Sequence, residues 1–389
     1  MEVIIKMKLN KYQTIALEKM QDSRAISHKL LKEFSDKEGA LYSFLHIVKR
    51  HDDELNVCFR GNNNAIEIYY LNHLVWKLTP ADKGNFRVSF NFNHAKLMPD
   101  RMEYLKRLEM DGKGFVLKNT GEIEWIKESF SKKDINDGLW QIFKDIMDFC
   151  FDPLKGTPQI EKRWQHKFFR DFHTYECLTK GFYVYDLEYH QKLPNKKELN
   201  KMFIGKTDDE LKSMGVHSDV MKNVVVKNEP DFIGIELDTE TNESYLIFGE
   251  IKSLYKSCNG KSGIMSHLEK MKEFMETDIL VNKRKAEAES MLQQYSAIGD
   301  ITKTTGLEGL SKRLKIKNVL VLTDSKYHDK NNTVVEWDKK GGAIKYFEDN
   351  RNDIIDKANE VRCEIWLVKN ACCDDETPIT MKHNICCIK

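Results

Sequence analysis

Two acidic residues and a lysine stand at the ends of two neighbouring apolar runs in the stretch NEPDFIGIELDTETNESYLIFGEIKS. Asp231 opens the first run, and Glu250 and Lys252 close the second. The alternating apolar residues predict two β-strands, and the turn-rich DTETNES between them predicts a hairpin. In such a hairpin Asp231 lies beside Glu250. The two-residue period of a strand then places Lys252 on the same face as Glu250.

This grouping predicts a site for a divalent metal ion. Two adjacent carboxylates repel each other unless a positive charge lies between them. Mg²⁺ prefers oxygen ligands, and a bound Mg²⁺ acidifies water and stabilises charge on a phosphodiester. A nearby ammonium group can orient or deprotonate the attacking water, or pair with the phosphate. We therefore predict metal-assisted phosphodiester hydrolysis, with Mg²⁺ as the cofactor and Mn²⁺ able to replace it.

Other acid-x-lysine tripeptides in the chain lack this context. Asp111-Gly112-Lys113 follows a segment with helical spacing, and Asp324-Ser325-Lys326 follows a strand that no acid-led partner strand precedes. The alternative explanation for Glu250 and Lys252 is an ion pair at the solvated edge of a hairpin.

Pro230-Asp231, the hairpin and Glu250-Ile251-Lys252, with a helix predicted on each side, resemble the PD-(D/E)XK nuclease superfamily. The resemblance covers about residues 157–370 and implies a restriction-endonuclease-like fold. It also implies that Asp231 and Glu250 bind the metal and that Lys252 assists catalysis. Members often carry a further acid on the preceding helix, which suggests a metal contact for Glu161. A first-turn acid that stabilises the helix dipole explains Glu161 equally well.

Some members carry a glutamine and a tyrosine four residues apart on the helix after the lysine, whereas this chain has the sequence QQY ending at Tyr295. Gln294 is the glutamine that the resemblance leaves as a candidate. Lys283, Arg284 and Lys285, at the start of the same predicted helix, are the predicted phosphate contacts. A solvated basic helix face is the alternative explanation for these three residues.

The length of 389 residues suits two or three domains, and the hydrophobic content of 41% excludes wholesale disorder. Residues 1–150 predict helices followed by an antiparallel meander, a domain that would recognise substrate, bind a protein partner or form a homo-oligomer. The Pro- and Gly-containing segment 151–159 predicts a linker between separate cores. Residues 157–389 alternate helices and strands, which predicts an α/β (α+β) domain with a mixed sheet flanked by helices.

The predicted meander combines basic and aromatic residues. This combination suits stacking on bases and contact with phosphates, although packing in an aromatic core explains it equally well. The residues concerned are Arg60, Tyr69, Tyr70, Trp76 and Arg87.

The formal net charge is only +1, so any binding of nucleic acid must come from local patches. No apolar run reaches 18 residues and no signal peptide is evident, which predicts a cytoplasmic protein without membrane contact. The nine cysteines lack the spacing of a disulfide framework and predict free thiols. The alternative is a zinc site built from the cysteine pairs 372–373 and 386–387 together with His383.

These observations predict a Mg²⁺-dependent nuclease that acts on DNA rather than RNA. The superfamily's usual roles suggest restriction or antiviral defence. The alternative is a nucleic-acid-binding or assembly protein that keeps the nuclease fold but does not cut.

Overall fold

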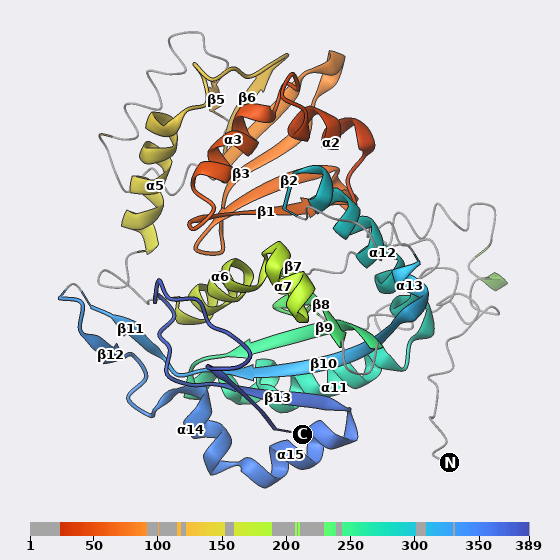
Figure 1. The fold of residues 1–389 in the computed structure, drawn as a ribbon, viewed down its shortest axis with the longest axis vertical. Coiled ribbons are helices and arrows are strands. Elements are labelled where there is room, and N and C mark those ends of the chain that lie inside the picture. The colour runs from red at the N-terminus through yellow and green to blue at the C-terminus, as the bar shows by residue number, and fades with distance from the viewer. Residues whose placement is uncertain are drawn as a thin grey trace.

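The computed structural model describes residues 24–91, 100, 115–117, 122–151, 159–188, 207, 209–210, 229–238, 243–300, 309–329 and 331–388. In these residues the chain forms two six-stranded sheets, one from each half of the chain, together with a small two-stranded hairpin (Figure 1). Helices lie around and between the sheets, so the protein is of the mixed α and β class.

The N-terminal sheet is antiparallel, and its first four strands form the predicted meander. Its strands are β1 (Leu55–Arg60), β2 (Ala65–Tyr70), β3 (His73–Pro80), β4 (Phe86–Asn91), β5 (Phe115–Leu117) and β6 (Glu122–Lys127), in the order β1-β2-β3-β4-β6-β5. Helices α2 (His28–Ser35), α3 (Tyr42–Arg50) and α5 (Asp137–Phe151) accompany this sheet (Figure 1). The helix predicted near residues 99–110 and most of the predicted linker lie outside the described residues.

The C-terminal sheet is mixed, as predicted. Its strands are β7 (Phe182–Leu187), β8 (Phe232–Asp238), β9 (Glu243–Lys252), β10 (Leu314–Leu322), β13 (Cys363–Val368) and β14 (Ile385–Ile388), in the order β14-β13-β10-β9-β8-β7. Strands β8 and β9 are antiparallel neighbours, whereas β10 runs parallel to both β9 and β13. The hairpin of β11 (Lys326–His328) and β12 (Val334–Glu336) follows β10.

Helices connect the parallel strands. Two of the helices that the spacing of apolar residues predicts are each divided into two shorter helices. The helix predicted before the hairpin is divided into α6 (Ile160–Phe172) and α7 (Tyr175–Lys180). The division occurs because the Thr174 side chain accepts a hydrogen bond from the Cys177 N–H and so caps a new helix. The helix predicted after the hairpin is likewise two helices, α11 (Ile264–Met275) and α12 (Asp278–Ala297). Helices α14 (Gly342–Asp349) and α15 (Arg351–Glu360) precede β13.

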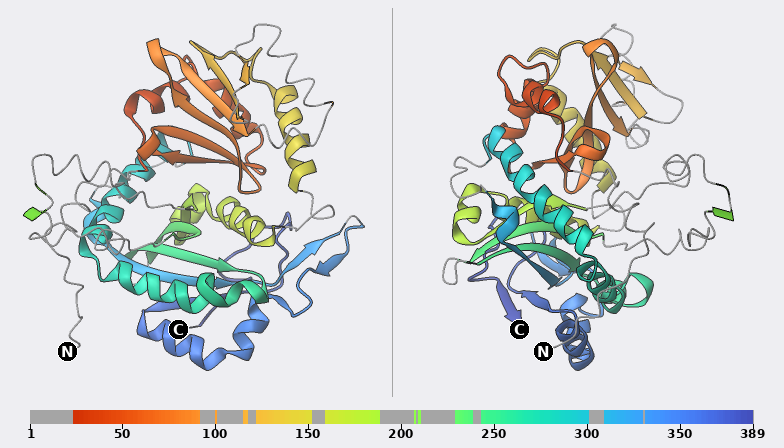
Figure 2. Two further views of the ribbon diagram at one scale, coloured as in Figure 1. Left: turned by 180° about the vertical axis from the view of Figure 1, so that it is seen from behind. Right: turned by 90° about the vertical axis from the view of Figure 1, so that its right-hand side faces the viewer.

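The prediction of a separate core for each half of the chain is wrong. One continuous cluster of buried apolar side chains includes Phe44 and Trp76 from the first half and Tyr185, Ile235 and Leu292 from the second. Helix α12 runs from the C-terminal sheet to the N-terminal sheet, so its apolar residues are buried against both (Figure 2).

Most of the basic and aromatic residues singled out in the meander belong to this interior. Trp76 is fully buried, with edge-to-face contacts to Phe44 and Trp140, and Tyr70 is 5% exposed. Arg60 is also buried, and its Nη1 atom lies 2.5 Å from the carboxylate of Asp186 on β7. Core packing therefore explains these residues, and the prediction that they stack on bases or contact phosphates is wrong for Arg60, Tyr70 and Trp76.

A buried histidine at the contact between the halves predicts a pH-dependent stability. The ring of His166 on α6 is buried, with its Nδ1 atom 2.9 Å from the side-chain amide nitrogen of Asn56 on β1. Burial, with smaller contributions from Arg170 and Arg163, lowers the pKa of His166 to about 3. The unfolded chain protonates this ring near pH 6.5, whereas the folded chain does not, so stability falls as the pH decreases from about 6.5 towards 3.

We expect the free energy of unfolding to be smaller at pH 5 than at pH 7.5, with His166 contributing about 2 kcal/mol of the difference. Urea unfolding of the wild-type protein and of His166→Gln at both pH values measures this contribution. The variant can still hydrogen-bond to Asn56 but cannot take up a proton in this range. An equal pH dependence in the two proteins would contradict the assignment.

Candidate active site

The hairpin of β8 and β9 brings together the three residues on which the sequence prediction rests. Phe232 pairs with Gly249, so Asp231 stands opposite Glu250 one position further along the antiparallel strands. A side chain at Gly249 would place its Cβ atom 1.9 Å from Cζ of Phe232. The Phe232 ring therefore packs directly over the glycine, and this contact favours the register that aligns the two acids.

Both oxygens of the Asp231 carboxylate are held by hydrogen bonds. Oδ2 accepts from the backbone N–H of Ile251 at 2.7 Å, and Oδ1 accepts from Nε2 of Gln165 on α6 at 2.6 Å. The Gln165 side chain in turn accepts a hydrogen bond from the amide of Asn72, which lies in the β2–β3 turn of the N-terminal sheet. The orientation of Asp231 thus depends on residues from both halves of the chain.

Glu250 and Lys252 form a buried ion pair on one face of β9. Nζ of Lys252 lies 2.6 Å from Oε1 of Glu250, and the two residues are 4% and 2% exposed. The other carboxylate oxygen of Glu250 lies 3.1 Å from Nδ1 of His267 on α11. Glu161 also reaches the site, with Oε1 3.6 Å from Nζ of Lys252 and Oε2 accepting a hydrogen bond from Ser257.

The electrostatics of the site reflect three carboxylates that share one ammonium. Burial, followed by the charges of Glu250 and Glu161, raises the pKa of Asp231 well above its usual range. Burial alone would raise the pKa of Glu250, but the hydrogen bond with His267 and the charge of Lys252 hold it below its usual value. Burial would lower the pKa of Lys252, but the neighbouring carboxylates raise it, so this lysine remains a cation. A hard divalent cation would neutralise the remaining negative charge.

Gln165 and His267 are contacts of the site that the sequence prediction missed. Gln165 follows Glu161 by four residues, which places both on one face of α6, so helical spacing offered a signal for it. His267 offered no such signal, because its contact with Glu250 arises only when α11 packs beside β9.

The structure contradicts two of the predicted nucleic-acid contacts on α12. Arg284 is 2% exposed and pairs with Glu287 at 2.8 Å. Gln294 is buried, and its side-chain amide forms hydrogen bonds to the backbone N–H and C=O of Ile26. Arg284 is therefore buried in an ion pair within α12, and Gln294 joins the two halves of the chain. Lys283 and Lys285 lie on the same helix and are only partly exposed.

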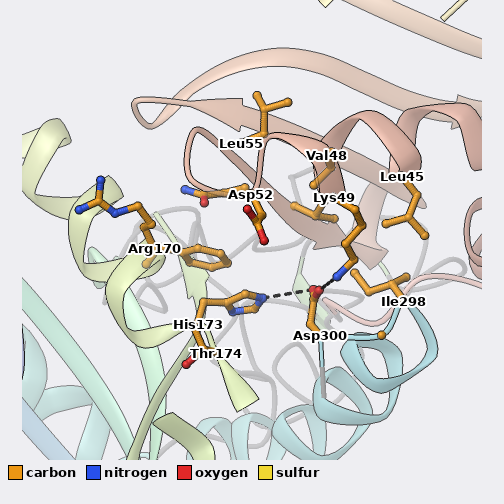
Figure 3. Close-up of a pocket in the computed structure, with 14 residues that line it drawn as sticks. Leu45, Val48, Lys49, Asp52, Leu55, Arg170, His173, Thr174, Ile298 and Asp300 are labelled. Atoms are coloured by element: carbon orange, nitrogen blue, oxygen red, sulfur yellow. Dashed lines mark hydrogen bonds and ion pairs between the residues drawn. The ribbon is translucent and has the colours of Figure 1, made fainter. Parts of the chain in front are cut away.

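A separate cavity of about 260 Å³ lies between α3, α6 and the end of α12 (Figure 3). Three of its polar groups are paired with one another, since Asp300 contacts both Lys49 and Nε2 of His173, the latter at 3.4 Å. The other ring nitrogen of His173 lies 2.7 Å from the backbone oxygen of Val184. These contacts connect three elements, which explains the cluster as part of the junction between the halves.

In the part of the chain that the structure describes, the set of three His, Cys, Asp or Glu ligand atoms gathered closely enough to hold a metal ion is found elsewhere, at His328, Cys372 and Asp374. The ligand atoms of His328, Cys372 and Asp374 lie within 4.8 Å of one another. Asp374 already accepts hydrogen bonds from the backbone N–H of His328 at 2.9 and 3.2 Å, which explains the cluster as a contact between the β11–β12 hairpin and the segment after β13. His383 is not one of these donors and the cysteines are free thiols, so the predicted zinc set is not assembled.

Comparison with protein-family models, with curated proteins and with solved structures finds no match for this chain. Among the described residues, no helix is both long and apolar enough to cross a membrane. What the site can do is therefore inferred from its own geometry and charge.

Proposed function

We propose that the protein is a metal-dependent nuclease of the PD-(D/E)XK type that hydrolyses phosphodiester bonds of DNA. The observation that carries the proposal is the grouping of Asp231, Glu250 and Glu161 around the single ammonium of Lys252 at the end of the β8–β9 hairpin. Burying like charges together is unfavourable for folding, which supports a role in chemistry. The mixed sheet, with α6 before the hairpin and α11 after it, supports the fold assignment.

Asp231, Glu250 and Glu161 would hold the metal, because hard oxygen donors are the ligands that Mg²⁺ and Mn²⁺ take in nucleases of this kind. A bound Mg²⁺ supplies a Lewis acid that offsets phosphate charge and acidifies a water molecule. Gln165 and the Ile251 N–H orient Asp231, and His267 orients Glu250. Such outer contacts control how well the carboxylates bind a cation.

Lys252 would act as a cation rather than as a base. Its raised pKa keeps the ammonium protonated at neutral pH. The group can therefore donate a hydrogen bond to a phosphate oxygen or to the attacking water and stabilise the negative charge that develops in the transition state.

Asp231→Asn and Glu250→Gln should each abolish Mg²⁺-dependent DNA cleavage with little loss of folding, because each keeps the shape of the side chain and removes a ligating charge. The double variant should be barely slower than either single variant, since residues that act as one unit are not additive. Cleavage of plasmid and oligonucleotide DNA by the purified proteins measures this. Glu243→Gln is the matched control, because Glu243 lies at the other end of β9 and pairs with Lys315. Undiminished cleavage by Glu250→Gln would exclude the site, and DNA binding without any wild-type cleavage would favour a non-catalytic binding protein.

Lys252→Met should slow the chemical step by a factor on the order of 10² or more, because a cation that stabilises the transition state is lost. Its affinity for Mg²⁺ should be equal to or higher than that of the wild type, because the ammonium no longer competes for Glu250. Single-turnover cleavage and calorimetric titration with Mn²⁺ separate the two effects. Lys315→Met, which removes an exposed lysine at the other end of the hairpin, serves as the control. Loss of metal binding in Lys252→Met would contradict this role.

Gln165→Ala should weaken Mg²⁺ binding by about 10-fold, because Asp231 loses one of its two hydrogen bonds. Asn72→Ala should act in the same direction with a smaller effect, since it reaches Asp231 only through Gln165. The dependence of the thermal midpoint of unfolding on Mg²⁺ concentration measures the Mg²⁺ affinity independently of activity. Gln141→Ala, an exposed glutamine on α5, is the control. Unchanged stabilisation by Mg²⁺ in Gln165→Ala would show that this contact does not position a metal ligand.

A further inference from the structure

A groove lined by five lysines lies immediately after the end of β10. It has a volume of about 820 Å³ and is formed by the β11–β12 hairpin, α14 and the segment after β13. The residues that define this lysine groove are Lys326, Lys339, Lys340, Lys345 and Lys369.

The lysine groove adjoins the candidate active site. The N–H of Thr323 donates to the backbone oxygen of Lys252 at 3.0 Å, and Asp324, the next residue, lines the groove. The indole N–H of Trp164 donates to the backbone oxygen of Asp324 at 3.0 Å, and Trp164 lies on α6 between Glu161 and Gln165. The wall of the groove is thus hydrogen-bonded both to β9, which carries Glu250 and Lys252, and to α6, which carries Glu161.

The groove carries a surplus of positive charge that the chain as a whole does not have. Its five lysines face three acidic residues in the lining, whereas the net charge of the protein is +1. Asp324 pairs with Lys326 at 2.7 Å. Among the described residues no carboxylate pairs with Lys339, Lys340 or Lys369, all of which are exposed. Nζ of Lys340 does lie 5.3 Å from the centroid of the Tyr255 ring. Local lysines without a carboxylate partner are the contacts that phosphate backbones use.

An exposed tryptophan precedes Lys339 by two residues in the chain, and its ring makes an edge contact with that of Tyr327. Trp337 is 38% exposed, and its backbone N–H donates to Ser325 at 3.0 Å, which holds it at the base of the β11–β12 hairpin. Val334, which lines the groove, is 50% exposed. Only one other large apolar residue among the described residues is as exposed, so two of the three lie on this small hairpin. Exposed aromatic rings and lysines in one short segment are a combination that suits binding of unpaired bases and their phosphates.

We infer that the lysine groove binds the phosphodiester backbone of a single-stranded segment of the substrate and that Trp337 stacks on one of its bases. The inference rests on the proposed function and adds to it the form of nucleic acid that the site receives. A single strand fits because a stacking ring needs a free base face, which neighbouring base pairs cover in a duplex. The surface inferred to contact phosphates is therefore this groove, and not α12 as the sequence predicted.

The test is binding of a fluorescein-labelled DNA single strand of about 20 nucleotides, longer than the roughly 4–16 that one such site covers. Fluorescence anisotropy in EDTA measures affinity without cleavage. The Lys339→Glu/Lys340→Glu variant should bind at least about 10-fold more weakly, and its salt dependence should be shallower by about 1.4, at about 0.7 per phosphate contact on a single strand. Trp337→Ala should bind about 10-fold more weakly, whereas Trp337→Phe should retain most of the affinity. A duplex of the same sequence should bind more weakly than the single strand.

Lys29→Glu/Lys32→Glu is the matched control, because it makes the same charge change at two exposed lysines of α2, at the opposite end of the molecule from α14 (Figure 1). This control should bind as the wild type does. In cleavage assays the groove variants should need a higher DNA concentration than the wild type to reach half of their maximal single-turnover rate, because the lysines bind the substrate.

Unchanged binding by the groove variants, while the wild type still cleaves DNA with Mg²⁺, would overturn the inference and leave the proposed nuclease in place. Tighter binding of duplex that is insensitive to Trp337→Ala would also overturn it. A wild-type protein that neither binds nor cleaves DNA would overturn the proposed function and the inference together.

Discussion

The carboxylate of Asp186, fully buried between two arginines, is the interaction on which the arrangement of the two halves depends. Arg24 precedes the N-terminal sheet, Arg60 ends β1 and Asp186 lies on β7, with the guanidinium nitrogens 2.8 and 2.5 Å from its oxygens. Removing one partner of a buried ion pair destabilises a protein by about 3–5 kcal/mol, so the loss of any of these three charges would weaken the contact between the halves. The shared hydrophobic core then forms around this polar centre, with Tyr295 of α12 hydrogen-bonded beside it to β1 or β7.

This contact between the halves explains how the N-terminal half helps to orient a residue of the candidate active site. With β1 held against β7, the β2–β3 turn places Asn72 against Gln165, and Gln165 holds Asp231. The turn can adopt this position because Leu71 and Asn72 both have positive φ angles, of 49° and 57°, as tight hairpin turns of this kind require. The first half of the chain is therefore part of the framework that orients a carboxylate in the second half.

The candidate active site and the lysine groove share one edge of the C-terminal sheet. Strands β9, β10 and β13 run parallel, so their carboxyl ends meet on one side, where open sheets of this kind bind their ligands. Glu250 and Lys252 occupy the end of β9, and the groove begins directly after β10. Charge divides this edge into two parts. Three carboxylates gather on the side of β8 and β9, and unpaired lysines gather on the side of α14. The carboxylates would attract a metal ion, and the adjacent lysines would attract a phosphate backbone.

The sequence by itself determined the features that depend on neighbouring residues. The period of two in β8 and β9 and the short connection between them align Asp231 with Glu250 and Lys252, because hairpin register is set locally. The meander was predictable for the same reason. Only the tertiary structure decided that Gln165 and His267 join the site, that Arg284 is buried and that the halves share a core. Helical spacing cannot tell a solvated basic face from one that is covered by a distant segment. The Arg24 backbone, for example, bonds to Glu287 at a separation of 263 residues. Contacts of this kind exist only after the whole chain has packed.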